Sequence, residues 1–203
     1  MEDHPGPHDG VVMRGKPARR GEGMSEGATQ TPSALFLQFS RNKLMTQYWP
    51  RLKECVESLT EEQVWWRPNA ASNSIGNLML HLNGNMRQWI VAAFGSEEDK
   101  RDRPAEFAAQ SGMSRAELLK KLGATVHEVE RTLDRLTEKE LTAEYEIQGY
   151  DVHGLDAVYQ VIEHFGLHFG QIAYITKMLR SEDLGFYKEL NRTGRVEKQS
   201  SAG

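Results

Sequence analysis

The fold of this chain is decided by residues 154–175, whose sequence is GLDAVYQVIEHFGLHFGQIAYI. Large apolar side chains recur there every three or four residues, which is the spacing of an α-helix with one buried face. The pattern continues to about residue 180 and predicts one long helix. His164, His168 and Gln171 lie on the seam of this helix among apolar neighbours, where polar groups without partners are costly.

Three earlier segments carry the same helical periodicity, at residues 33–58, 74–94 and 114–136. Pro50 should kink or break the first of them, because proline lacks a backbone N–H and clashes with the preceding turn. The third opens with the capping-box sequence Ser114-Arg-Ala-Glu117. Four long helices joined by modest connections predict an all-α fold, the four-helix bundle.

The connections break this pattern in three places. Residues 61–73 contain Trp65-Trp66-Arg67-Pro68, which predicts a turn with aromatic anchors at one end of the bundle. Residues 96–112 are polar and long for a connection, and predict either a crossover loop or part of a pocket lid. The mixed charges of residues 97–103 are typical of a solvated loop. Residues 142–153 alternate in polarity and predict an extended arm or a short hairpin.

The two ends of the chain differ in composition from the bundle. Residues 1–32 are rich in glycine and proline and almost lack large apolar side chains, so burial cannot offset the entropy lost on ordering. We predict a disordered N-terminal tail there, a bundle over residues 33–190, and a flexible C-terminal tail over residues 191–203. Met24 is a second candidate for the start of translation.

Composition narrows the class of protein. The chain has 203 residues, 25 Lys and Arg against 29 Asp and Glu, and a net charge of −4. The folded part has no stripe of basic residues, which argues against phosphate-based binding of nucleic acids. The sequence contains no run of about 18 apolar residues, so it predicts no membrane-spanning helix. The single cysteine, Cys55, cannot form an intrachain disulfide and is typical of a small core residue, so we expect a cytoplasmic protein.

The histidines are the strongest candidates for chemistry. His164 and His168 are four residues apart, so both imidazoles project from one face of a helix and can share a transition metal. His81, on the second predicted helix, can supply a third ligand if that helix faces the fourth. A metal would satisfy these buried rings, but a core histidine satisfied by ordinary hydrogen bonds remains the alternative.

Other polar residues on the same faces are candidates for supporting roles. Asn77, Asn85 and Gln171 could bond a ligand's free ring nitrogen or a bound water. His153, at the start of the fourth helix, is interpreted as a cap residue or as a substrate contact. His127 is predicted to be solvated. No Asp or Glu falls on the predicted faces of the site.

Residues 74–89, SIGNLMLHLNGNMRQW, resemble helix two of the DinB-like or YfiT-like superfamily, and residues 154–175 resemble its helix four. The resemblance covers residues 33–190, and the sequence is most similar to an uncharacterised branch of the superfamily. It implies an up-down-down-up bundle with a divalent metal, zinc or nickel, held by three histidines. Carried over by position, those ligands are His81, His164 and His168.

The resemblance also implies a set of functions. Relatives include transferases and isomerases that use a low-molecular-weight thiol, and others described as metal-dependent hydrolases. We therefore expect a thiol-dependent transferase acting on a small-molecule substrate, with a hydrolase or a non-catalytic metal-binding stress protein as alternatives. Relatives are often dimers, and a homodimer face is expected from aromatic residues that exceed the needs of one seam: Tyr48, Trp49, Tyr174 and Phe186.

Overall fold

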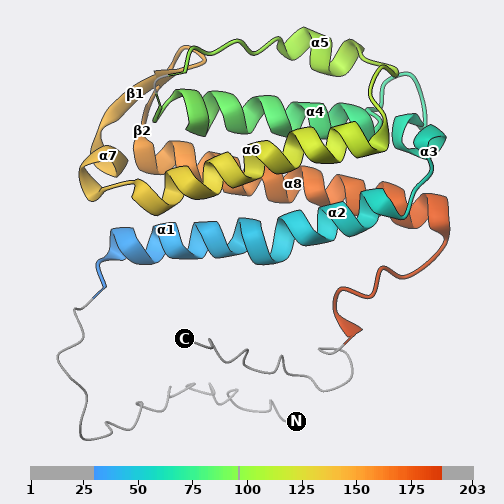
Figure 1. Ribbon diagram of the computed structural model, residues 1–203, viewed down its shortest axis with the longest axis horizontal. Coiled ribbons are helices and arrows are strands. Elements are labelled where there is room, and N and C mark those ends of the chain that lie inside the picture. The colour runs from blue at the N-terminus through green and yellow to red at the C-terminus, as the bar shows by residue number, and fades with distance from the viewer. Residues whose placement is uncertain (1–29, 96, 189–203) are drawn as a thin grey trace, which may run out of the picture. The chain divides into compact units, whose positions relative to one another are not determined.

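A computed structural model of the chain describes residues 30–95 and 97–188 (Figure 1). Four long helical segments dominate it, and two of them include a π-helical turn. The first is α1 (Pro32–Asn42), η1 (Lys43–Tyr48) and α2 (Trp49–Glu57), and the second is α4 (Ile75–Met86) and η2 (Arg87–Ala92). The third is α6 (Arg115–Arg135), and the fourth is α8 (Gly154–Arg180).

Contacts between the segments define the topology as up-down-down-up. Each of α4 and α1–α2 packs against both α6 and α8, so the first and second segments lie diagonally opposite (Figure 1). Helices α4 and α6 are parallel, because the hydrogen-bonded pairs Asn83–Thr125 and Arg87–Glu128 follow in the same order along both helical segments. The α4–α8 pair is antiparallel, since His81 contacts His164 while Trp89 reaches back to Gln148.

Local signals fix where the helices begin. Thr31 caps α1, and Ser74 and Ser114 each form a capping box at the starts of α4 and α6. The expected break at Pro50 does not occur. The π-helical turn η1 widens the helix ahead of it, and Pro50 falls in the first turn of α2, where a missing N–H is tolerated.

The connections are more ordered than the sequence indicated. The turn expected after residue 60 contains a short helix, α3 (Glu61–Trp65), and the crossover between α4 and α6 contains another, α5 (Arg103–Ala108). A further short helix is α7 (Glu138–Thr142). The hairpin of β1 (Glu144–Ile147) and β2 (Tyr150–His153) confirms one of the two expected forms of this segment.

The crossover matters most for the site. It runs over the outer side of α4, as Figure 1 shows, and places α5 beside that helix. Arg67, in the motif after α3, donates to the backbone carbonyls of Phe107 and Ala109 and to Oδ1 of Asn77. Asn77 in turn donates to the carbonyl of Glu106 at 2.9 Å. These bonds pin the crossover to the N-terminal end of α4.

The apolar faces of the four segments form a single core of leucine, valine and isoleucine, in which Leu44, Leu82, Val126 and Phe165 are fully buried. Two of the four aromatics among which we expected a dimer face take part in the packing within the chain. Tyr48 stacks on Phe165. The Trp49 ring packs so closely over Gly123 that a Cβ at that position would lie 3.0 Å from it.

Phe186 likewise packs within the chain, against Phe169, whereas Tyr174 is 67% exposed. Among the residues described, no helix has both the length and the apolar character to cross a bilayer. Most of the predicted N-terminal tail, residues 1–32, and all of the predicted C-terminal tail, residues 191–203, lie outside the described part of the chain.

Candidate metal centre

Three imidazoles meet where α4 faces α8. His81 Nε2 lies 3.1 Å from His164 Nε2, which lies 3.1 Å from His168 Nε2. All three offer a ligand nitrogen within 4.8 Å of the others. The antiparallel packing brings His81 level with His164, and the four-residue spacing on α8 adds His168 from the next turn. His81 is buried, and the other two are half-buried.

The arrangement fits a divalent cation. Nitrogen ligands at about 2.1 Å from a tetrahedral zinc ion are separated by roughly 3.4 Å, close to the 3.1 Å between His164 Nε2 and the Nε2 atom of each of the other two rings. Each ring turns Nε2 inward and Nδ1 outward, as shared coordination requires. Three protein ligands also leave a coordination position for a water or a substrate, which is the pattern of catalytic rather than structural sites.

His81 has a carboxylate as its outer partner. Its Nδ1 lies 2.8 Å from Glu106 Oε2, and the Glu106 side chain is 9% exposed. Arg101 holds the same carboxylate from the other side, donating from Nε to Oε1 at 2.8 Å and from Nη2 to Oε2 at 3.0 Å. Because the carboxylate can only accept, it directs the Nδ1 proton of His81 toward itself and leaves Nε2 free to bind a metal.

The charge run at residues 97–103 is therefore not entirely solvated, because the Arg101 side chain is only 4% exposed. Burial alone would raise the pKa of Glu106, but hydrogen bonds from His81 and Arg101, with their charges, outweigh it and lower the pKa. Glu106 is thus held as a carboxylate at neutral pH. The predicted faces of the site carry no Asp or Glu, and the acidic residue that the sequence did not reveal, Glu106, reaches the site from the crossover.

Space for this pair is provided by Gly84, one turn after His81. A Cβ at Gly84 would lie 1.9 Å from Glu106 Oε1 and 2.9 Å from Arg101 Nε. The small residue at this position was visible in the sequence, on the face that carries His81. It was the one available signal that another group approaches α4 at this level.

The other two histidines have different surroundings. His168 Nδ1 lies 2.7 Å from Oε1 of Gln171, so the structure brings this predicted supporting residue to the site. His164 Nδ1 is buried without a hydrogen-bond partner among the residues described. Burial, followed by the charges of neighbours that include His168 and His81, lowers the pKa of His164 to about 3. Burial is also the largest cause that lowers the pKa of His168. Both rings are therefore neutral and able to bind a metal near pH 7.

The remaining predicted residues lie farther out. Asn77 contacts none of the histidines and acts on the backbone of Glu106. Asn85 is buried one turn beyond His81, and its Oδ1 finds no partner within the described residues. His153 is the N-cap of α8, about 16 Å along the helix from His164, and pairs with Asp156. His127 is exposed, beside Glu130.

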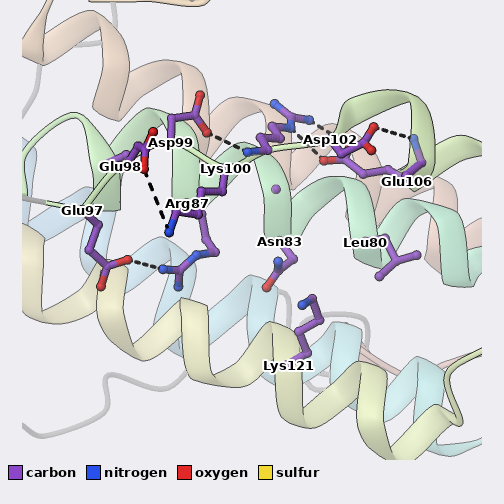
Figure 2. A pocket seen from close by; sticks show the side chains of 14 residues that line it. Leu80, Asn83, Arg87, Glu97, Glu98, Asp99, Lys100, Asp102, Glu106 and Lys121 are labelled. Atoms are coloured by element: carbon purple, nitrogen blue, oxygen red, sulfur yellow. Dashed lines mark hydrogen bonds and ion pairs between the residues drawn. The ribbon is translucent and has the colours of Figure 1, made fainter.

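A cavity of about 640 Å³ adjoins the Arg101–Glu106 pair. Its walls come from α4, α6 and the crossover, and Figure 2 shows Lys121 of α6 pointing toward Asn83 on α4. At its other end Arg87 is paired with Glu97. None of the three histidines lines this cavity, so Arg101 and Glu106 form the wall between it and the metal centre.

An up-down-down-up bundle with three converging histidines defines a DinB-like architecture, and comparison with known proteins agrees. Residues 32–189 match the family described as "Protein of unknown function (DUF1572)". The chain belongs to this family, which is DinB-like. No curated protein matches the sequence significantly.

Solved structures share the fold at low sequence identity. A conserved protein from Enterococcus faecalis is 20% identical, with a TM-score of 0.60 over 71% of this chain and 97% of its own. A DinB-like protein, YjoA, from Bacillus subtilis is 17% identical, with a TM-score of 0.56 over 74% and 97%. A DinB-like protein from Bacillus cereus is 16% identical, with a TM-score of 0.54 over 71% and 91%.

Proposed function

We propose that this protein is a divalent-metal-dependent transferase that joins a low-molecular-weight thiol to a small electrophile. The observation that carries the proposal is the donor set: three imidazole nitrogens converge, and the carboxylate in contact with His81 is held by an arginine. When bound there, a zinc or nickel ion would lower the pKa of a thiol and hold it as a thiolate.

Charge at the site favours an anionic ligand such as a thiolate. Burial lowers the pKa of both His164 and His168, so these two rings are neutral near pH 7, and Arg101 balances the charge of Glu106. The positive charge of a divalent ion would therefore not be offset by its protein ligands. An anion at the open coordination position would supply that balance in a half-buried site, where charge interactions are stronger than in bulk water.

The hydrolase alternative needs a group that the site does not offer. Hydrolysis of amides and alkyl esters releases an amine or alkoxide that needs a proton, and the carboxyl group in contact with a ligand histidine is Glu106. Its lowered pKa and its two partners keep it ionised and occupied, so it serves to orient His81 rather than to transfer protons. Transfer of a thiolate to an electrophile requires no such proton donor when the electrophile releases halide.

The test is a thiol-conjugation assay on protein purified without a histidine tag. Metal content is measured by mass spectrometry, and apo, zinc-loaded and nickel-loaded samples are assayed with several thiols and 1-chloro-2,4-dinitrobenzene. The thiolate sulfur forms the C–S bond as chloride leaves, and the thiol proton passes to solvent. We expect conjugation that depends on both metal and thiol.

The matched variants are His168→Ala and His127→Ala. Losing one of three ligands should abolish metal retention and conjugation together, because two imidazoles cannot fix the ion. His127 is exposed and remote, so its substitution should change neither. Metal-dependent hydrolysis of ester substrates without thiol dependence would favour the hydrolase. Thermal stabilisation by metal with no turnover would favour the non-catalytic metal-binding stress protein.

A further inference from the structure

Arg103 stands at the outer edge of the metal centre. It begins α5, and its guanidinium carbon lies 5.1 Å from the centre of the Phe107 ring. The Phe107 ring in turn lies 4.7 Å from the ring of His81. The guanidinium carbon of Arg103 therefore lies no farther from the His81 ring centre than the sum of these two distances. Arg103, Phe107 and His81 form a stack that leads from the exposed surface to the candidate metal site.

Arg103 differs from Arg101 and Arg67, the neighbouring arginines of this region, in that its side chain has no hydrogen-bond or ion-pair partner among the described residues. Arg101 is committed to Glu106, and Arg67 to Asn77 and the backbone. Within residues 30–95 and 97–188, Arg103 makes neither an ion pair nor a side-chain hydrogen bond. The cation–π contact holds the guanidinium over the Phe107 ring and leaves its N–H groups to bind a carboxylate with two parallel bonds.

The charge of Arg103 also reaches the histidines. It is among the charges that, after burial, lower the pKa of His164. The acidic groups that face this part of the site are Glu106, which Arg101 holds, and Glu163 on α8, which is exposed; neither is paired with Arg103. A carboxylate bound between Arg103 and the site would thus meet an unbalanced positive charge near the surface of the bundle.

We propose that Arg103 binds the carboxylate of an acidic thiol whose sulfur reaches His81, His164 and His168. This inference rests on the proposed function, and it adds the class of thiol: one with a carboxylate a few bonds from the sulfur. Phe107 lies within 5.1 Å of the Arg103 guanidinium carbon and 4.7 Å of the His81 ring, so it links the two ends of the proposed site.

The experiment compares two thiols that differ only in the anionic group, N-acetylcysteine and N-acetylcysteinamide. Binding to the cobalt-loaded full chain is followed by the sulfur-to-cobalt charge-transfer absorption, which needs no turnover. For the wild type we expect the acid to bind about ten-fold more tightly than the amide, which corresponds to about 1.4 kcal/mol. The preference should weaken as salt is raised, because exposed charges are screened.

Variants at Arg103 separate this role from a structural one. Arg103→Gln should remove the preference for the acid while leaving the dissociation constant of the amide unchanged. Arg103→Lys should keep part of the preference, since it retains charge but not the fork. Arg131→Gln, an exposed arginine on α6, is the matched control and should bind both thiols as the wild type does.

Three results would overturn the inference. One is an acid-to-amide preference that survives in Arg103→Gln, and another is an equal loss of both thiols in that variant, which would mean that Arg103 only supports the fold. The third is equal binding of both thiols by the wild type, which would leave thiol chemistry at the metal intact. If the cobalt protein bound neither thiol, the proposed function itself would fail.

Discussion

Replacing Glu106 by glutamine removes one charge from the centre of the site and changes its volume little. Both carboxylate oxygens are used, Oε1 by Arg101 and Oε2 by both His81 and Arg101. A glutamine has one accepting oxygen and one donating nitrogen. Whichever way it turns, an N–H group faces a donor of Arg101 or the Nδ1 proton of His81.

The substitution should have two separate effects, one on metal affinity and one on the free energy of unfolding. Loss of an outer partner typically weakens metal binding 10- to 100-fold, or about 1.4 to 2.7 kcal/mol. Removing the partner of a buried charge costs about 3 to 5 kcal/mol of folding stability. The Arg101 side chain is 4% exposed, but Gln88 still accepts one of its hydrogen bonds, so we expect the lower end, about 3 kcal/mol.

The two effects are measured on different samples. Urea unfolding of metal-free protein gives the free energy of unfolding, and competition with a chromophoric chelator gives the metal dissociation constant. Adding Arg101→Gln to Glu106→Gln should restore much of the stability, since no buried charge then lacks a partner, but should not restore metal affinity. The matched control is Glu128→Gln, which breaks the half-exposed pair with Arg87 and should cost less than about 1 kcal/mol.

The reasoning would be refuted if Glu106→Gln bound metal within two-fold of the wild type. It would also be refuted if the double variant recovered metal affinity together with stability, because the carboxylate would then act only through the fold.

Three further predictions concern the same bundle. Gly84→Ala should lower metal affinity at least several-fold while the protein remains folded, because the new Cβ meets only side-chain ends, those of Glu106 and Arg101, and no backbone; circular dichroism and chelator competition test this, and unchanged affinity would contradict it. The folded pKa of His164, about 3, lies below its ordinary 6.5, so the unfolded chain binds the extra proton and metal-free stability should fall as pH drops from 7 toward 3. Allowing for partial exposure, the His164 contribution to the loss from pH 7 to pH 5 is about 1 kcal/mol by urea unfolding, and the loss should shrink by that amount in His164→Gln. Leu167 and Tyr174, 54% and 67% exposed on α8, are expected to pack in a homodimer, so changing both to Glu should convert a dimer to a monomer in sedimentation at tens of micromolar, and a monomeric wild type would end the idea.

The long helices and the three ligand candidates could be read from the sequence because each depends on a regular spacing. Apolar residues at the helical period predicted the segments, and the four-residue interval predicted that His164 and His168 share a face. Placing His81 opposite His164 needed one further assumption, that α4 faces α8, which the antiparallel contact of these helices bears out.

Features that lack a period were missed or misread. Glu106 lies 25 residues after His81 in the chain, in a connection whose path no spacing rule fixes. Arg101 was read as part of a solvated run because sequence shows the density of charge, not which member of the run is buried. Tyr48 and Trp49, two of the candidates for a dimer face, pack closely over Gly166 and Gly123. These contacts join different helices, so the sequence alone did not show them.

These failures share a physical cause that bears on how the site works. The seam between α4 and α8 is apolar, and a lone carboxylate within it would be too costly to bury. The crossover carries both Glu106 and Arg101, so the carboxylate is paired with a guanidinium where it packs over Gly84. The helices therefore determine where the ligand nitrogens lie, while the crossover determines the charge around them. Because Arg103 lies on the same short helix as Glu106, a change in this one connection would alter both the support of the metal and the proposed choice of thiol, without disturbing the bundle.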